Sequence, residues 1–250
     1  MYKIDINPKG IKIYFDEEKH KYWTDKVTDF TSVTTFIKQF FPKFDREGIS
    51  KRYALKNGLK QEEVLANWEI NNQQSRDLGS NIHSYCECYL LKQNLPEPIN
   101  EKASIIFKSA RNKLDSLLNN FKIVASEKIV FSEELQLCGT ADLLVRENKT
   151  GQLYLLDFKT NKKIDRENRY GKFALNPFGH LAHNNFMHYS IQLNTYRKLF
   201  QQEQYFDEEI KMGIIHFEHS GSSKSYIISN MENDVTNMIN SHLSTFGIVL

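Results

Sequence analysis

Two apolar runs that each lead to a carboxylate, joined by a short polar turn, constrain the fold of this chain most. Asp142 ends the segment Gly-Thr-Ala-Asp, and fifteen residues later Asp157 opens the segment Asp-Phe-Lys, which ends at Lys159. The residues Asn148–Gly151 between them are typical of a turn. This pattern predicts a β-hairpin that brings two carboxylates and one ammonium group to the same end.

Side chains of these types at one end of a hairpin are suited to phosphodiester cleavage. Two carboxylates can hold Mg²⁺ or Mn²⁺ with positions left for water and phosphate. Lys159 lies two residues beyond Asp157, on the same strand face, where it can orient or activate the attacking water. The alternative is a solvated hairpin with ordinary surface charges. The run Leu153–Leu156 argues against it, because charges at the end of a buried strand are more often functional.

The chain contains further motifs in a fixed order around this hairpin. A Gly-Ser-Asn-Ile-His segment comes first, and a Gln-Leu-Asn-Thr-Tyr segment comes last. Together with the hairpin, this order resembles the PD-(D/E)XK nuclease superfamily, and within it the RecB-like exonuclease branch. The segment Thr31–Ile37 is also similar to the Ser-Val-Thr opening of mitochondrial genome maintenance exonucleases and related phage-encoded nucleases. The residues that carry the resemblance are His83, Asp142, Asp157, Lys159, Gln192 and Tyr196.

The resemblance implies a fold and an activity. The fold would be α/β (α+β), a restriction-endonuclease-like core with a central mixed β-sheet flanked by helices. The activity would be metal-dependent hydrolysis of DNA from single-stranded or frayed ends, in replication, recombination or repair. The cofactor would be Mg²⁺ or Mn²⁺, held by Asp142, Asp157, His83 and the Phe158 carbonyl. Lys159 would position the hydroxide.

Four further residues belong to the expected site. Gln192 and Tyr196 are spaced to share one helix face and would hold the scissile nucleotide, or else form a polar pair that anchors the helix. Glu87 follows His83 by one helical turn, and we expect it to hydrogen-bond a metal ligand or Tyr196. Glu127 precedes an expected strand, and we expect it either to support the metal ligands or to be a third acidic residue of the site. Outside the motif order, His83 would be read as an ordinary helical histidine.

Basic residues follow the catalytic strand closely. The formal net charge of +2 is too small for bulk attraction to a polyanion, so DNA binding has to come from a local cluster. The alternative is a solvated loop, since Asp165 and Glu167 dilute the field. The residues expected to contact DNA here are Lys162, Lys163, Arg166 and Arg169. The histidines at 180, 183 and 188 are expected to shape the mouth of the site.

Composition fits one domain over residues 1–250, with an N-terminal hairpin and helical region to about 120 and a sheet core over about 121–230. We expect no membrane span, signal peptide or mitochondrial presequence, and hence a cytoplasmic protein of a bacterial or phage-infected cell. Three cysteines show no disulfide framework and cannot supply the four thiolates of an iron–sulfur cluster.

Periodicity and turn residues predict the elements in outline. A β-hairpin is expected at 11–15 and 20–23, with helices at 33–41, 46–95, 100–120 and 189–201. The second of these should break at Gly58 and at Asp77–Ser80. Strands are expected at 122–125, 128–131, 137–146, 152–159, 212–218 and 225–229.

Two other functions remain open on the sequence. A structure-specific or double-strand endonuclease would use the same metal centre. A nucleic-acid binding module without turnover would share the fold, but the intact set of two aspartates and a lysine argues against it.

Overall fold

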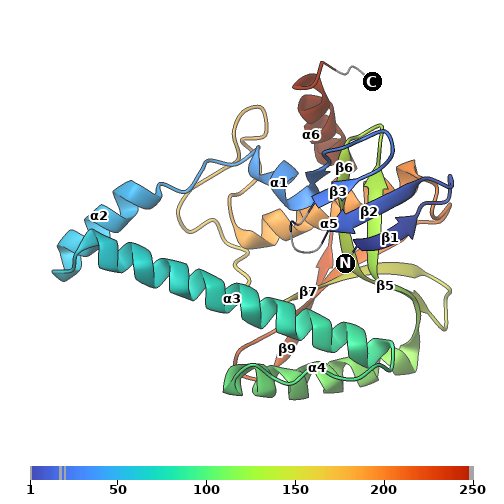
Figure 1. Cartoon of the computed structure of the whole chain (residues 1–250), viewed down its shortest axis with the longest axis horizontal. Helices are drawn as coiled ribbons and strands as arrows, with labels where there is room; N and C mark the ends of the chain where they lie inside the picture. The colour runs from blue at the N-terminus through green and yellow to red at the C-terminus, as the bar shows by residue number, and fades with distance from the viewer. Residues whose placement is uncertain (1, 17–18, 20, 248–250) are drawn as a thin grey trace.

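The computed structural model describes residues 2–16, 19 and 21–247 of the chain (Figure 1). The chain opens with a small antiparallel sheet of three strands, β1 (Tyr2–Ile6), β2 (Lys12–Asp16) and β3 (Lys21–Trp23). Its inner face packs on the main sheet through Phe15 and Tyr22, which join Phe131 in one buried cluster. The hairpin expected at this end is confirmed for its described residues, and β1 is an additional strand.

The main sheet has six strands: β4 (Thr31–Ser32), β5 (Phe121–Ser132), β6 (Leu137–Glu147), β7 (Leu153–Lys159), β8 (Ile210–Phe217) and β9 (Ser223–Ile228). The order is β4-β6-β7-β8-β9, and β5 also pairs with β6. β6 and β7 form the expected antiparallel hairpin, whereas β7 and β8 run parallel. Between β7 and β8 the chain crosses over through α5 (Asn185–Gln202). The predicted mixed sheet flanked by helices is confirmed.

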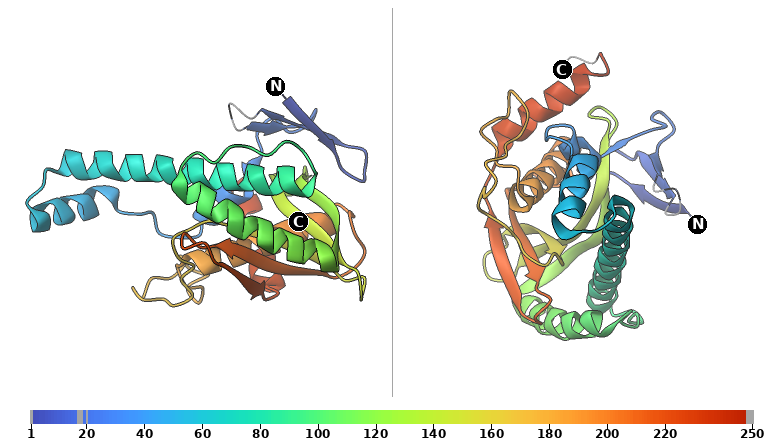
Figure 2. Two further views of the ribbon diagram at one scale, coloured as in Figure 1. Left: turned by 90° about the horizontal axis from the view of Figure 1, so that it is seen from below. Right: turned by 90° about the vertical axis from the view of Figure 1, so that its left-hand side faces the viewer.

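Helices cover both faces of this sheet (Figure 2). On one face, α3 (Gln61–Leu90) and α4 (Glu101–Asn120) bury a cluster with Leu143, Val145 and Phe158. On the other, α1 (Val33–Lys38), α5 and α6 (Glu232–Ser244) bury a second cluster with Leu144 and Leu155. Alternate residues of a strand point to opposite faces. The hairpin strands are therefore buried on both sides, as their near-continuous apolar sequence requires.

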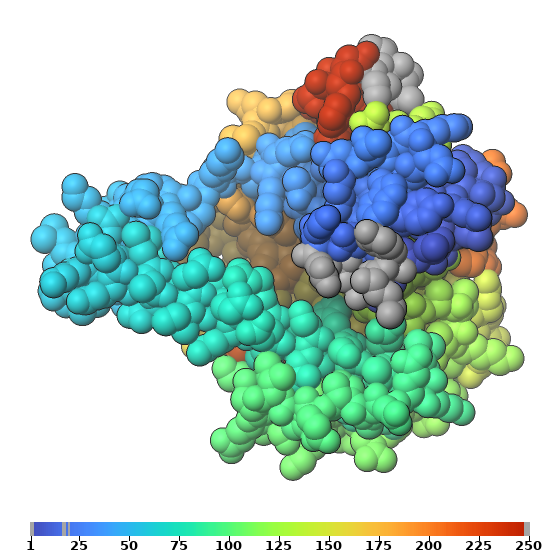
Figure 3. All heavy atoms as spheres, viewed as in Figure 1, coloured from blue at the N-terminus to red at the C-terminus, as the bar shows by residue number. Residues whose placement is uncertain are grey.

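α3 is long enough to leave the body of the protein. Its 30 residues span about 45 Å at the usual rise of an α-helix. The first part of α3 packs against α2 (Arg46–Asn57) and forms an arm that projects from the rest (Figure 1). Gly58 ends α2 with φ of 64°, a left-handed cap that glycine adopts without strain. The surface is hollowed between this arm and the α1 region (Figure 3).

Several predicted boundaries are wrong. The helix expected to break at Asp77–Ser80 runs on without interruption in α3. Leu78 and Ile82 are buried on its inner face, and this burial outweighs the roughly 1 kcal/mol that a helical glycine costs. The strands expected at 122–125 and 128–131 form one strand, β5, with a bulge between Ile123 and Ala125. The helix α5 starts at Asn185 instead of 189 because Asn184 caps it, and α6 was not predicted.

None of the helices in the described part of the chain is long and apolar enough to cross a lipid bilayer. The three cysteines are free thiols. Cys86 and Cys138 are buried, and Cys88 lies half-buried near the C-terminal end of α3.

Candidate functional site

The site lies where the two hairpin strands separate. Pairing between β6 and β7 ends at Leu143 and Leu156, and Asp142 and Asp157 are the next residues beyond it. The backbone N–H of Phe158 donates instead to Asp142 Oδ2 at 2.7 Å. A buried backbone donor needs a partner, and here a carboxylate replaces the neighbouring strand. The fork in the sheet therefore holds the Asp142 side chain in a defined place.

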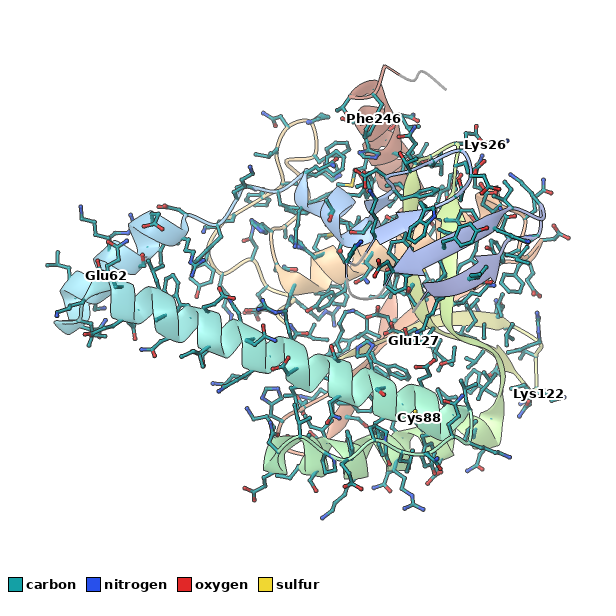
Figure 4. All side chains as sticks on the ribbon, viewed as in Figure 1. Lys26, Glu62, Cys88, Lys122, Glu127 and Phe246 are labelled. Atoms are coloured by element: carbon teal, nitrogen blue, oxygen red, sulfur yellow. The ribbon has the colours of Figure 1, made fainter. Side chains whose placement is uncertain are left out.

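His83 reaches this fork from α3. Its Nε2 lies 3.0 Å from the Phe158 carbonyl oxygen, and its Nδ1 lies 3.5 Å from Asp142 Oδ2 and 3.8 Å from Glu127 Oε1. Ligand atoms of His83, Glu127 and Asp142 all lie within 4.8 Å of one another. Figure 4 labels Glu127 between the small N-terminal sheet and α3. These three side chains, from α3, β5 and β6, are called the acidic trio below.

Glu127 enters the trio through an unusual backbone conformation. Its φ is 48°, in the left-handed region that few residues other than glycine adopt. Such strain often marks functional positions. Burial raises the pKa of the Glu127 carboxyl, the nearby His83 imidazole lowers it, and the charges of Asp142 and Glu87 raise it further. Of the two expectations for Glu127, a supporting residue or a third acidic residue, its place beside His83 and Asp142 favours the second, and the charge of Glu87 acts on it from nearby.

The His83 imidazole interacts electrostatically with both carboxylates of the trio. Burial lowers the pKa of His83, but Asp142 and then Glu127 raise it to about 10. Burial would raise the pKa of Asp142, yet the charges of His83 and Lys159 hold it below its ordinary value. His83 is therefore an imidazolium that offsets two carboxylates. A bound divalent cation would supply the same charge, and the imidazole would then coordinate as the neutral base.

Asp157 forms a second, adjacent unit with Lys159. Their side chains form an ion pair and lie on one face of β7, as predicted. The Asp157 side chain is 3% exposed and that of Lys159 14% exposed. Burial raises the pKa of Asp157 to about 6, although Lys159 opposes this rise. Burial lowers the pKa of Lys159, but Asp157 and Asp142 raise it above its ordinary value, so Lys159 is an ammonium group at neutral pH.

The structure adds residues that the sequence did not single out. The Lys159 ammonium lies 4.7 Å from the centre of the Tyr189 ring, and the Tyr189 hydroxyl donates to Asn161 Oδ1 at 2.6 Å. His216 Nε2 lies 2.7 Å from the Asn161 carbonyl oxygen, and His219 Nε2 lies 2.8 Å from that of Thr160. Tyr189 precedes Gln192 by three residues and Tyr196 by seven, so all three lie on one face of α5. This spacing can be seen in the sequence.

Gln192 and Tyr196 lie on α5 next to the trio. Tyr196 is only 4% exposed, and Gln192 Nε2 donates to its hydroxyl at 3.5 Å. A Cβ on Gly139 would lie 2.7 Å from Tyr196 Cε1, so the ring packs directly on the backbone of β6. Gly139 and Tyr196 belong to two separate sequence motifs, and in the structure they are in direct contact. This contact places Tyr196 in a supporting position and leaves Gln192, which is half-buried, more accessible.

Two hollows adjoin the trio. The larger one, about 1110 Å³, is lined by His83, Phe158 and Lys159 on one side and by the middle of α3 and the start of α4 on the other. We call it the large cleft. The smaller one, about 290 Å³, includes Glu127 and Tyr196 in its lining and lies beneath the N-terminal sheet. We call it the small cavity.

The predicted basic residues lie on the segment between β7 and α5, and all four are exposed. Lys162 lines the large cleft. Arg166 lies with its guanidinium 5.0 Å from the centre of the Phe186 ring. Lys163 lies 3.8 Å from Asp165, and Arg169 lies near both Asp165 and Glu167. The acidic neighbours thus partly offset the positive charges of Lys163 and Arg169.

The histidines of this segment are docked against helices. His180 Nε2 lies 2.8 Å from Asp234 Oδ1 on α6. His183 and His188 stack with ring centres 5.1 Å apart, and both rings contact Phe41 after α1. They therefore fix the path of the chain into α5.

Comparison of the chain with protein-family models gives no match, and the search among curated proteins likewise finds none.

Proposed function

We propose that this chain is a metal-dependent deoxyribonuclease. It hydrolyses the phosphodiester bonds of DNA, starting from single-stranded or frayed ends. The observation that carries the proposal is the acidic trio, with the Asp157–Lys159 pair beside it, at the edge of the large cleft. The order of motifs in the sequence supports the same activity. The free thiols are consistent with action in a reducing cytoplasm.

The residues of the trio fit Mg²⁺ or Mn²⁺. Carboxylate and carbonyl oxygens suit both ions, and one imidazole favours Mn²⁺ somewhat more. Asp142, Glu127 and His83 would hold the ion, with the Phe158 carbonyl and Asp157 adjacent. A bound divalent ion neutralises phosphate charge and lowers the pKa of water.

The protein residues then account for orientation and charge. In hydrolysis, a water oxygen bonds to phosphorus, the ester P–O bond breaks, and the departing oxygen receives a proton. Lys159 is held as an ammonium by Asp157 and Tyr189, so it can donate hydrogen bonds to the attacking water or to a phosphate oxygen. A preorganised donor of this kind acts mainly on the transition state.

The test uses end-labelled single-stranded DNA with Mg²⁺, Mn²⁺ or excess EDTA. We expect hydrolysis with either metal, none in EDTA, and none for Asp142→Asn. Asp77→Asn makes the same charge change elsewhere in the large cleft and should stay active. Mn²⁺ should also raise the melting temperature of the unmodified protein but not of Asp142→Asn, because only a ligand bound to the folded state stabilises it. Hydrolysis that persists in EDTA would refute the metal mechanism.

A further inference from the structure

The small cavity and the large cleft adjoin the acidic trio at different members of it. Glu127 belongs to both the trio and the cavity lining, while His83 belongs to the trio and the lining of the large cleft. A phosphate held at the trio would therefore lie next to both hollows. The two hollows differ nearly fourfold in volume, about 290 Å³ against 1110 Å³.

The walls of the small cavity combine an aromatic surface with polar groups. Phe15 and Tyr22 stack with ring centres 4.2 Å apart and belong to this lining. The Tyr22 hydroxyl lies 3.2 Å from Thr140 Oγ1, and the other polar residues of the lining are Lys3, Ser32, Thr34 and Glu127. Aromatic faces accept nucleobases, and hydroxyl and ammonium groups bind phosphate and sugar oxygens.

The size of the cavity limits what it can hold. Pockets for small ligands have volumes of about 300–1,000 Å³, and the small cavity lies at the lower limit of this range. This is room for one nucleotide. The hydrogen bond between Tyr22 and Thr140 also joins the N-terminal sheet to β6 at the cavity wall.

We infer that the small cavity binds the terminal nucleotide of a DNA strand, with its linking phosphate at the trio and the remainder of the strand in the large cleft. This inference rests on the proposed nuclease function and adds the recognition of a free end. The N-terminal sheet then acts as an end stop, and each hydrolysis releases a mononucleotide.

Two neighbouring threonines of α1 provide a matched test. Thr34 and Thr35 are both exposed, but only Thr34 lines the small cavity. Thr34→Phe should fill the cavity, whereas Thr35→Phe places the same side chain about 100° away around the helix. The probes are thymidine 5′-monophosphate and thymidine 3′-monophosphate, with Mn²⁺ present. We expect Thr34→Phe to weaken binding of the preferred probe at least about tenfold and Thr35→Phe to leave it within about twofold. The preferred probe also indicates the polarity of digestion.

Product analysis separates this inference from the nuclease function. The unmodified protein should release mononucleotides from linear single strands and cut closed single-stranded circles much more slowly; Thr34→Phe should slow the linear reaction. Circles cut as fast as linear strands, or equal probe binding by both variants, would overturn the end-binding role while leaving the nuclease intact. If no DNA is hydrolysed, the nuclease proposal fails, and the probe-binding comparison alone decides whether the cavity holds a nucleotide.

Discussion

Lys159 depends on contacts from two elements. Asp157 fixes its ammonium from the same strand, and the Tyr189 ring lies against it from α5. Its charge is retained in spite of burial because Asp157 and Asp142 together raise its pKa. A lysine in this state serves as a hydrogen-bond donor, because it has no free pair with which to accept a proton.

Lys159→Met should therefore lower kcat by about 10²-fold or more and change KM little, as expected when one preorganised donor is removed. The variant keeps the length and the apolar stem of the side chain. Lys162→Met, at an exposed position in the same cleft, is the control and should keep kcat within a few-fold. Single-turnover rates and circular dichroism of the folded protein check both expectations. A Lys159→Met enzyme with near-normal kcat would exclude a direct role for this ammonium.

His188 links stability to pH. Burial, together with the charges of His183 and Lys38, lowers the pKa of His188 to about 4. In the unfolded chain the ordinary value is near 6.5, so between pH 6.5 and 4 only the unfolded state takes up this proton. The free energy of unfolding should therefore fall as the pH falls through this window and level off below pH 4.

Urea unfolding from pH 8 to pH 4 measures this contribution. His188→Leu removes the titrating group and keeps an apolar side chain against Phe41. The difference in unfolding free energy between the two proteins should change across the window, even though carboxylates titrate in both. Parallel pH profiles would show that His188 is not held neutral by the fold.

At the scale of elements, two glycines show how helices support the forked sheet. A Cβ on Gly139 of β6 would lie 2.7 Å from the buried Tyr196 ring of α5, too close for any real contact. A Cβ on Gly79 of α3 would lie 3.6 Å from Thr160 Oγ1, an ordinary contact. The same substitution should therefore have opposite effects at the two positions.

Gly139→Ala should destabilise the protein by about 1–3 kcal/mol, because overpacking forces Tyr196 or β6 to move. Gly79→Ala should stabilise it by up to about 1 kcal/mol, because alanine is the better helix former. Denaturant midpoints of both variants give the comparison. Equal shifts in one direction would mean that the Tyr196 ring does not constrain β6.

The sequence predicts these elements well where a local pattern decides them. The β6–β7 hairpin follows from two apolar runs and a turn, and α1 begins at Val33, where the sequence predicts a helix start. The sequence-based prediction fails where contacts between residues far apart in the chain determine the structure. Gly79 is read as a break because its buried neighbours are not visible locally, and β1 is missed because its apolar residues Ile4 and Ile6 are exposed.

The same limit applies to the site. The sequence brings Asp142, Asp157, Lys159 and His83 to one region, and the structure places them there. It offers Glu127 only as a supporting residue or a third acidic candidate, because its place in the trio depends on a local left-handed backbone within β5. Nor does it predict that His216 and His219, from the end of β8, hold the segment after Lys159.

At the scale of the molecule, the trio lies between two hollows formed by different parts of the chain. α3, the start of α4 and the end of β7 form the large cleft, and the N-terminal sheet covers the small cavity. Basic side chains lie on one approach to the large cleft, on the segment that leads into α5. Because the net charge is only +2, the electrostatic attraction that the proposed function requires has to come from this local distribution.

Replacing Lys162 and Arg166 with alanine should weaken single-stranded DNA binding equally for every sequence and flatten its salt dependence. Each lost phosphate contact changes the slope of log K against log salt by about 0.7, so the pair should change it by about 1–1.5. Lys163 and Arg169 should contribute less, because Asp165 lies near both.

A double alanine variant at Lys149 and Lys211 is the control. These two exposed lysines lie outside the lining of both hollows, and their replacement removes the same charge. Binding titrations between about 50 and 200 mM salt measure the slopes. Equal slopes for the two double variants would show that the segment after β7 does not guide the strand, and that net charge alone sets the attraction.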